Sequence, residues 1–172
     1  IVPTKIPGLS IIPSTADLAG AEFELFNVPR RNFKLRDAIA AFMARGGRTL
    51  NAADQRTFDY VLIDCPPSLN TLTINAMTAA HGLLVPLQCE FFALEGLSQL
   101  SRTVELVRGS LNPTLDIQGV VLTMYDKRNK LSDQVAADVR KHMGDKVYQT
   151  VIPRNVRVSE APSHGRPVIV YD

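Results

Sequence analysis

The sequence contains few cysteines and no long apolar segment. Its two cysteines, Cys65 and Cys89, do not have the spacing of a metal site, and we expect both to be buried free thiols of a reducing cytosol. No apolar run approaches the ~20 residues that a helix needs to cross a bilayer. We therefore expect a cytoplasmic protein without a membrane partner.

Charge of one sign is also nearly absent, because the net charge of the 172 residues is only +2. With 45% hydrophobic and 21% charged residues, the composition is that of an ordinary globular protein, and we predict one domain over residues 1–172. Positive charge is nevertheless clustered locally. The clusters are Arg30, Arg31, Lys34 and Arg36; Lys127, Arg128 and Lys130; and Arg154, Arg157 and Arg166. Such clusters are most often solvated faces.

The most informative segment is Phe58–Leu69, with the sequence FDYVLIDCPPSL. Its apolar run Tyr60–Ile63 predicts a strand buried on both faces, as in a parallel sheet. Asp64 follows at the carboxyl end of that strand, where α/β proteins bind ligands. Pro66 and Pro67 then predict a stiff turn. The alternative is an ordinary strand that ends in a turn-favouring aspartate.

Strand-like and helix-like patterns alternate along the rest of the chain. Further strands are predicted at 9–12, Leu83–Leu87, Ile117–Thr123, Val147–Ile152 and Pro167–Tyr171. Helices are predicted at 16–26, from an Asn32 cap to Gly46-Gly47, at 69–82, at 90–111 and from a Ser132 cap to Gly144. A polar linker is predicted at 50–57. This rhythm predicts the α/β class, with a doubly wound, mostly parallel sheet.

Three separated segments resemble the ParA/Soj chromosome- and plasmid-partitioning ATPases. They are 58–87, TMYDKRN at 123–129 and VIPRNVRVSEAPSHGRPV at 151–168. These ATPases belong to the deviant-Walker P-loop class, which also contains MinD, and the resemblance is strongest over 58–172. Family members also carry a glycine-rich loop with two lysines, which this sequence lacks. The resemblance therefore implies an incomplete P-loop NTPase fold, an internal piece of a longer protein, and no ATP turnover by this chain alone.

The resemblance assigns roles around Asp64. The matching carboxylate of the family closes the Walker B strand and holds the shell of a Mg²⁺ ion, usually through water. The segment with Pro66 and Pro67 matches the switch II turn, which senses the γ-phosphate of ATP. A rigid turn without a sensing role is the alternative.

The base of ATP is assigned by resemblance to the ends of two later strands. Thr123 and Met124 match the purine contact of the family, and Pro153 and Asn155 match the loop over adenine. Two alternatives remain, because Asn155 would also suit a cap of the following turn and Met124 would suit the core.

The partners implied by the resemblance are a second copy in a nucleotide-sandwich dimer, non-specific DNA and a ParB-type protein that stimulates hydrolysis. The DNA contacts would come from Arg154, Arg157 and Arg166, in a cytoplasmic, nucleoid-associated protein. Glu90 and Glu95 could act across the dimer or be solvated carboxylates at a helix start. Two other functions are a non-catalytic dimerisation or DNA-binding module and a MinD-like cargo-positioning ATPase.

Overall fold

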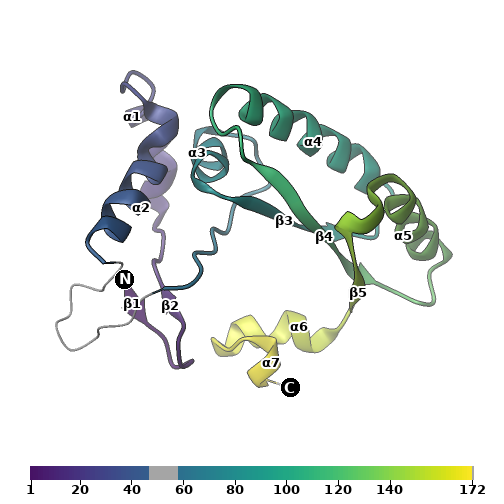
Figure 1. Ribbon diagram of the computed structural model, residues 1–172. Helices are drawn as coiled ribbons and strands as arrows, with labels where there is room; N and C mark the ends of the chain where they lie inside the picture. Colours follow the sequence, from purple (N-terminus) through teal and green to yellow (C-terminus); the bar gives the residue numbers. More distant parts are fainter. Residues whose placement is uncertain (47–57, 172) are drawn as a thin grey trace. The chain divides into compact units, whose positions relative to one another are not determined.

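The computed structural model describes residues 1–46 and 58–171 (Figure 1). These residues belong to two compact units, the first comprising Ile1–His81 with Gly109–Pro113 and the second Gly82–Arg108 with Thr114–Asp172. Each unit has its own secondary structure and its own buried residues, and each is described separately.

The first unit begins with a small hairpin and continues with helices. Strand β1 (Val2–Pro3) pairs antiparallel with β2 (Ser10–Ile11). Helical segments follow, namely a 3₁₀ turn at Ala16–Gly20, α1 (Ala21–Glu24), a 3₁₀ turn at Arg31–Phe33, α2 (Lys34–Ala44) and α3 (Thr71–Ala79). The short strand near 9–12 and the helical segment at 16–26 are thus confirmed.

Helix α3 organises the first unit through its polar side chains. Its cap, Asn70, accepts a hydrogen bond from the Thr73 amide, and the Glu22 carboxylate accepts one from the Thr71 amide at 3.1 Å. Within the helix, buried Asn75 donates to the Arg31 carbonyl at 2.9 Å and accepts from the Leu35 amide at 3.2 Å. These bonds attach both α1 and the start of α2 to α3.

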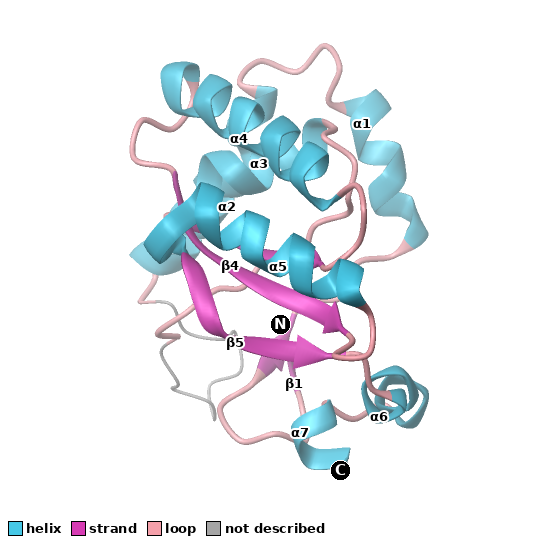
Figure 2. Ribbon diagram, turned by 90° about the vertical axis from the view of Figure 1, so that its right-hand side faces the viewer, coloured by secondary structure: helices cyan, strands magenta, loops and turns pink. Residues whose placement is uncertain are grey.

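The second unit is built on a parallel sheet in the order β3-β4-β5. Its strands are β3 (Gly82–Gln88), β4 (Asp116–Tyr125) and β5 (Val147–Pro153), and they are connected through α4 (Ala93–Ser110) and α5 (Lys130–Met143). Both helices lie on the same side of the sheet (Figures 1 and 2). The buried apolar residues of this core include Leu97, Val104, Val107, Ile117, Val120, Leu122, Val135, Val139 and Val147. The predicted α/β class with a parallel sheet is confirmed.

Short helical segments follow the sheet. A 3₁₀ turn at Gly144–Lys146 precedes β5, and α6 (Val156–Glu160), a 3₁₀ turn at Ala161–His164 and α7 (Val168–Tyr171) follow it. Gly144 ends α5 with φ of +55°, as predicted for a closing glycine.

The predicted strand at Tyr60–Ile63 is wrong for this structure. The segment is a loop, and Tyr60 and Leu62 are 85% and 90% exposed. Its apolar residues favour a strand, but a strand also needs a neighbour for its backbone hydrogen bonds. Among residues 1–46 and 58–171, no strand pairs with this segment.

The last predicted strand, Pro167–Tyr171, is also wrong, because these residues form α7. The Pro167 carbonyl accepts hydrogen bonds from the Val170 amide at 3.0 Å and the Tyr171 amide at 3.1 Å. The Tyr171 ring stacks on His164 with the ring centroids 4.9 Å apart. The local turn therefore supplies a hydrogen-bond acceptor for these amides, which in a strand would need the carbonyls of a neighbouring strand.

Three smaller predictions are corrected. Helix α2 follows Phe33 rather than an Asn32 cap, and α5 is capped by Asn129, whose side chain accepts from the Leu131 amide, so that Ser132 lies inside the helix. Cys89 is buried as expected, whereas Cys65 is exposed. Gly47 and the predicted linker at 50–57 lie outside the described residues.

Candidate functional site

The carboxyl ends of the three parallel strands bring the predicted base-contact residues together. Thr123 pairs with Gln88 at the end of β3, and Tyr125 pairs with Pro153 at the end of β5. Residues 123–124 and 153–155 therefore lie at adjacent strand ends, on the edge of the sheet where α/β proteins bind ligands.

Met124 has an unusual backbone at this edge. Its φ is +53°, a left-handed conformation that residues other than glycine rarely adopt. Its side chain is half-buried, so it is not simply a residue of the packed core. Strained backbone of this kind is concentrated at functional sites, where the surrounding structure holds it in place.

Arg154 connects all three strand ends. Its amide donates to the Tyr125 carbonyl at 2.9 Å, and its guanidinium donates to the Glu90 carboxylate at 3.1 Å. Glu90 follows β3, so this ion pair spans the sheet from the first strand to the last. The Glu90 carboxylate therefore has a partner within the sheet. To act elsewhere, it would have to release Arg154.

Asn155 and Arg157 form a local cap and an ion pair. The Asn155 side chain accepts from the Arg157 amide at 2.8 Å, which caps α6 as one of the two sequence interpretations expected. The Arg157 guanidinium contacts Glu160 at 3.2 Å. Arg166 is exposed, and its amide donates to the Ala161 carbonyl at 3.2 Å. Two of the three predicted DNA-binding arginines thus already contact carboxylates.

In the loop after β4, Arg128 of the second basic cluster pairs with Asp126 at 3.0 Å, a contact that was not predicted from the sequence. Hydrogen bonds from the side chain and then the backbone of Arg128 lower the pKa of Asp126 to about 2. The Tyr125 hydroxyl donates to Asp133, and this hydrogen bond raises the pKa of Tyr125. The sequence feature that could have predicted this ion pair is an aspartate just beyond a strand followed two residues later by an arginine.

Asp64 and the Pro-Pro turn lie in the first unit. Asp64, Pro66 and Pro67 are exposed. Partial desolvation by neighbouring atoms and then the nearby Asp64 charge raise the pKa of the Cys65 thiol, although the residue is exposed. The turn leads directly into α3, where the Thr73 hydroxyl donates to the Ser68 carbonyl at 2.6 Å.

The donor chemistry of Asp64 fits a magnesium ion. Carboxylate oxygen is a ligand that Mg²⁺ prefers, and the ion usually keeps several waters, so a single carboxylate can hold it. The base-contact residues belong to the second unit, whereas Asp64 belongs to the first.

No helix in the described part of the chain is long and apolar enough to cross a membrane.

Comparison with known proteins gives a consistent set of relatives. A protein-family model described as an AAA domain matches residues 1–117. The chain is 66% identical over 171 residues to the chromosome partitioning protein ParA of Caulobacter vibrioides, covering 99% of this chain and 60% of that protein. It is 52% identical over 169 residues to the sporulation initiation inhibitor protein Soj of Bacillus subtilis, covering 98% of this chain and 62% of that protein.

A solved structure agrees with these relatives. Cobyrinic acid a,c-diamide synthase from Mycobacterium smegmatis, solved with a bound ATP analog and magnesium, matches with a TM-score of 0.68 and 36% identity, covering 90% of this chain and 63% of that one. The chain thus spans about 60% of the length of the curated relatives named above. The fold, the family match over residues 1–117 and the similarity to these relatives show that the chain belongs to the AAA-domain family, among the proteins of ParA/Soj type.

Proposed function

We propose that this chain serves ATP-dependent DNA partitioning as part of a ParA-type ATPase. The observation that carries the proposal is the 66% identity to a chromosome partitioning protein across nearly the whole chain. The solved relative with an ATP analog and magnesium supports ATP and Mg²⁺ as the cofactors. The chain would act within a single domain over residues 1–172 in a cytoplasmic, nucleoid-associated protein.

Asp64 would hold Mg²⁺ through water, and the turn with Pro66 and Pro67 would respond to the γ-phosphate. Magnesium neutralises the charge that develops on the phosphates during transfer. The turn is suited to a switch because it connects the carboxylate directly to the capped start of α3. A shift of the turn would therefore be passed on to a helix that holds α1 and α2.

The base would lie against the strand ends of the second unit. Met124 and Pro153 would supply an apolar wall, and Thr123 would supply polar atoms beside it. Asn155 uses its side-chain oxygen to cap α6, so its amide group would be the part that faces the base. Arg154 would hold this loop in place through the Glu90 ion pair.

Dimerisation, DNA and a ParB-type protein complete the proposal. Non-specific DNA binding requires only positioned cations, since it is dominated by phosphate contacts. Arg166 would contact phosphate directly, whereas Arg154 and Arg157 would have to exchange a carboxylate for a phosphate.

The test is a chimera in which this chain replaces the matching 171 residues of Caulobacter vibrioides ParA. The chimera should hydrolyse ATP only with Mg²⁺. Asp64→Ala should lower that activity about 10–100-fold, the usual effect of losing a group that holds a metal through its outer shell. Steady-state phosphate release as a function of Mg²⁺ concentration is the measurement.

Asp59→Ala, at a carboxylate five residues earlier in the same loop, is the matched control and should leave hydrolysis unchanged. If Asp64→Ala turned over ATP at the parent rate with the same Mg²⁺ dependence, the assignment of this site would be wrong.

A further inference from the structure

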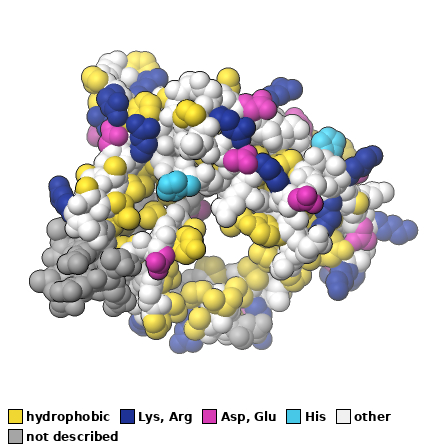
Figure 3. Space-filling view, in the orientation of Figure 1, with side chains coloured by type: hydrophobic (Ala, Val, Ile, Leu, Met, Phe, Trp, Pro, Cys, Tyr) yellow, Lys and Arg dark blue, Asp and Glu magenta, His cyan; other side chains and the backbone are white. Residues whose placement is uncertain are grey.

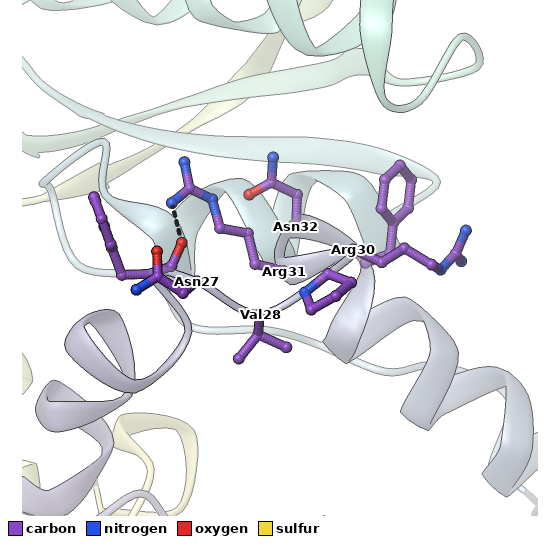
Figure 4. Close-up of a pocket in the computed structure, with 8 residues that line it drawn as sticks. Asn27, Val28, Arg30, Arg31 and Asn32 are labelled. Atoms are coloured by element: carbon purple, nitrogen blue, oxygen red, sulfur yellow. Dashed lines mark hydrogen bonds between the residues drawn. The ribbon is translucent and has the colours of Figure 1, made fainter.

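Two adjoining depressions lie on the first unit, and none of the residues to which the proposed function assigns a contact with ATP, Mg²⁺ or DNA lines them. One is lined by residues 26–33 and has a volume of about 390 Å³ (Figure 4). The other has a volume of about 650 Å³ and extends over α1 and the start of α3. Because both are lined by Phe26, Asn27, Arg31 and Asn32, we treat them as one surface and call it the basic–aromatic pocket.

The two arginines of this pocket, Arg30 and Arg31, and the neighbouring Arg36 contact phenylalanine rings. The Arg31 guanidinium lies 5.6 Å from the centroid of Phe26 and donates to the Phe26 carbonyl at 3.0 Å. Arg30 and Arg36 lie over Phe33, 4.9 and 4.4 Å from its centroid. Each guanidinium has five N–H donors, so these contacts leave donors for a ligand. In Figure 4, the side chains of Arg31 and Asn32 point to the same side of the segment and Val28 points to the other.

The segment that carries these arginines is held rigidly. Its carbonyl at Arg31 accepts from buried Asn75, which is only 4% exposed. Arg30 has φ of +56°, an uncommon left-handed backbone for a residue other than glycine. A segment ordered before binding loses less conformational entropy when a ligand arrives.

Apolar side chains adjoin the positive charge. Phe23 and Phe26, which line the larger depression, are 86% and 69% exposed, and Leu69 lies exposed in the same lining. Figure 3 shows hydrophobic and basic side chains side by side over the start of α2. Exposed phenylalanines in one place indicate a surface that another molecule covers.

The carboxylates nearby cancel only part of the positive charge. Among the residues that the structure describes, no acidic side chain lines the smaller depression. In the larger one, Glu22 accepts a hydrogen bond from the start of α3. Asp37 pairs with Arg30 at 3.1 Å and lies 3.9 Å from Arg36, so it offsets part of the charge of these two arginines. The Arg31 guanidinium instead donates to the Phe26 carbonyl and is the arginine on which the proposal depends.

We propose that the basic–aromatic pocket binds an acidic amphipathic segment of a partner protein. Carboxylates of the segment would take charge-assisted hydrogen bonds from Arg31 and its neighbours, and apolar side chains would cover Phe23 and Phe26. The phosphates of duplex DNA would satisfy the arginines but would leave the phenylalanines exposed. The inference is independent of the proposed function, since it uses none of the residues assigned to ATP or DNA.

The test uses this chain and a fluorescein-labelled peptide in which leucines alternate with pairs of glutamates. Fluorescence anisotropy should show saturable binding. Arg31→Ala should weaken it about tenfold, because one charge-assisted hydrogen bond is lost. Phe23→Ser, which leaves the charge unchanged, should weaken it several-fold because apolar contact is lost.

Arg102→Ala, at an exposed cation of α4, is the control for net charge and should have no effect. Circular dichroism of each variant shows whether the fold is retained, and Arg31→Lys provides a milder change if Arg31→Ala unfolds. The same peptide with glutamine in place of glutamate should not bind.

Two results would overturn the proposal. One is that neither Arg31→Ala nor Phe23→Ser changes the affinity for the acidic peptide. The other is tighter binding of a labelled duplex oligonucleotide that depends on Arg31 but not on Phe23, which would identify a nucleic-acid surface.

Discussion

At Gly119 the sheet of the second unit has no room for a side chain. This residue is buried in β4, and a Cβ atom built on it would lie 2.2 Å from Cε2 of Tyr148 on β5. The constraint comes from space rather than from backbone conformation. The close approach of this ring to β4 is therefore possible only because residue 119 is glycine.

Gly119→Ala should accordingly destabilise the fold by about 1–3 kcal/mol, as expected for overpacking. Tyr148 is partly exposed and its ring can move, so the double variant Gly119→Ala/Tyr148→Ala should be more stable than the sum of the two single changes indicates. Urea denaturation of the four proteins measures this coupling. If the changes in the free energy of unfolding were additive, the contact between residue 119 and Tyr148 would not be the cause of the destabilisation.

Asp126 is the residue at which acid sensitivity should be clearest. The contacts of Arg128 lower its pKa to about 2, below the ~3.9 of an unfolded chain. A lowered folded-state pKa stabilises the fold above the unfolded pKa, and this contribution is lost as pH falls through the folded one. The loss should therefore fall between pH ~4 and ~2.

Asp126→Asn should remove this part of the acid sensitivity. The variant should be less stable than the parent near neutral pH, and the difference should shrink as pH falls from ~4 to ~2. Urea midpoints measured across that range test it. Asp138→Asn, on the exposed side of α5, is the matched control, and a gap that stayed constant with pH would contradict the prediction.

Among the elements of the first unit, α3 is hydrogen-bonded to α1, to the 3₁₀ turn at Arg31–Phe33 and to α2. Its Asn75 bonds both to the 3₁₀ turn at Arg31–Phe33 and to α2. Because one buried amide satisfies a carbonyl and an amide of another segment, its loss would leave both groups without their partner.

Asn75→Ala should lower the free energy of unfolding by about 1–3 kcal/mol. It should also loosen the segment that carries Arg30 and Arg31, which trypsin cleavage after these residues would detect. Gln99→Ala, on an exposed part of α4, is the control for loss of an amide side chain. Unchanged stability and unchanged cleavage would show that packing alone holds α2 on α3.

The helices and strands that were predictable from the sequence are those whose pattern is determined within one segment. The spacing of Leu97, Val104 and Val107 correctly predicted α4, and apolar runs correctly predicted β3, β4 and β5. The runs at 60–63 and 167–171 have the same composition but are not strands. Strand formation there depends on a neighbour, which a local pattern does not contain.

The same distinction applies to the candidate site. The proximity of Thr123 and Pro153 was predictable, since the carboxyl ends of parallel strands share one edge. The Glu90–Arg154 ion pair was not, because its members are 64 residues apart and nothing local links them. The left-handed backbone of Met124 had no signal either, since methionine does not favour that conformation.

For the whole molecule, the ion pairs of Arg154 and Arg157 would weaken the proposed DNA binding and its dependence on salt. A cation that meets a phosphate normally releases a condensed counterion from the DNA, and this release makes affinity depend steeply on salt. Here Glu90 and Glu160 already accompany two of the three arginines. If those carboxylates stay nearby when DNA binds, their repulsion offsets part of the attraction, so this surface would hold DNA weakly and let it go readily.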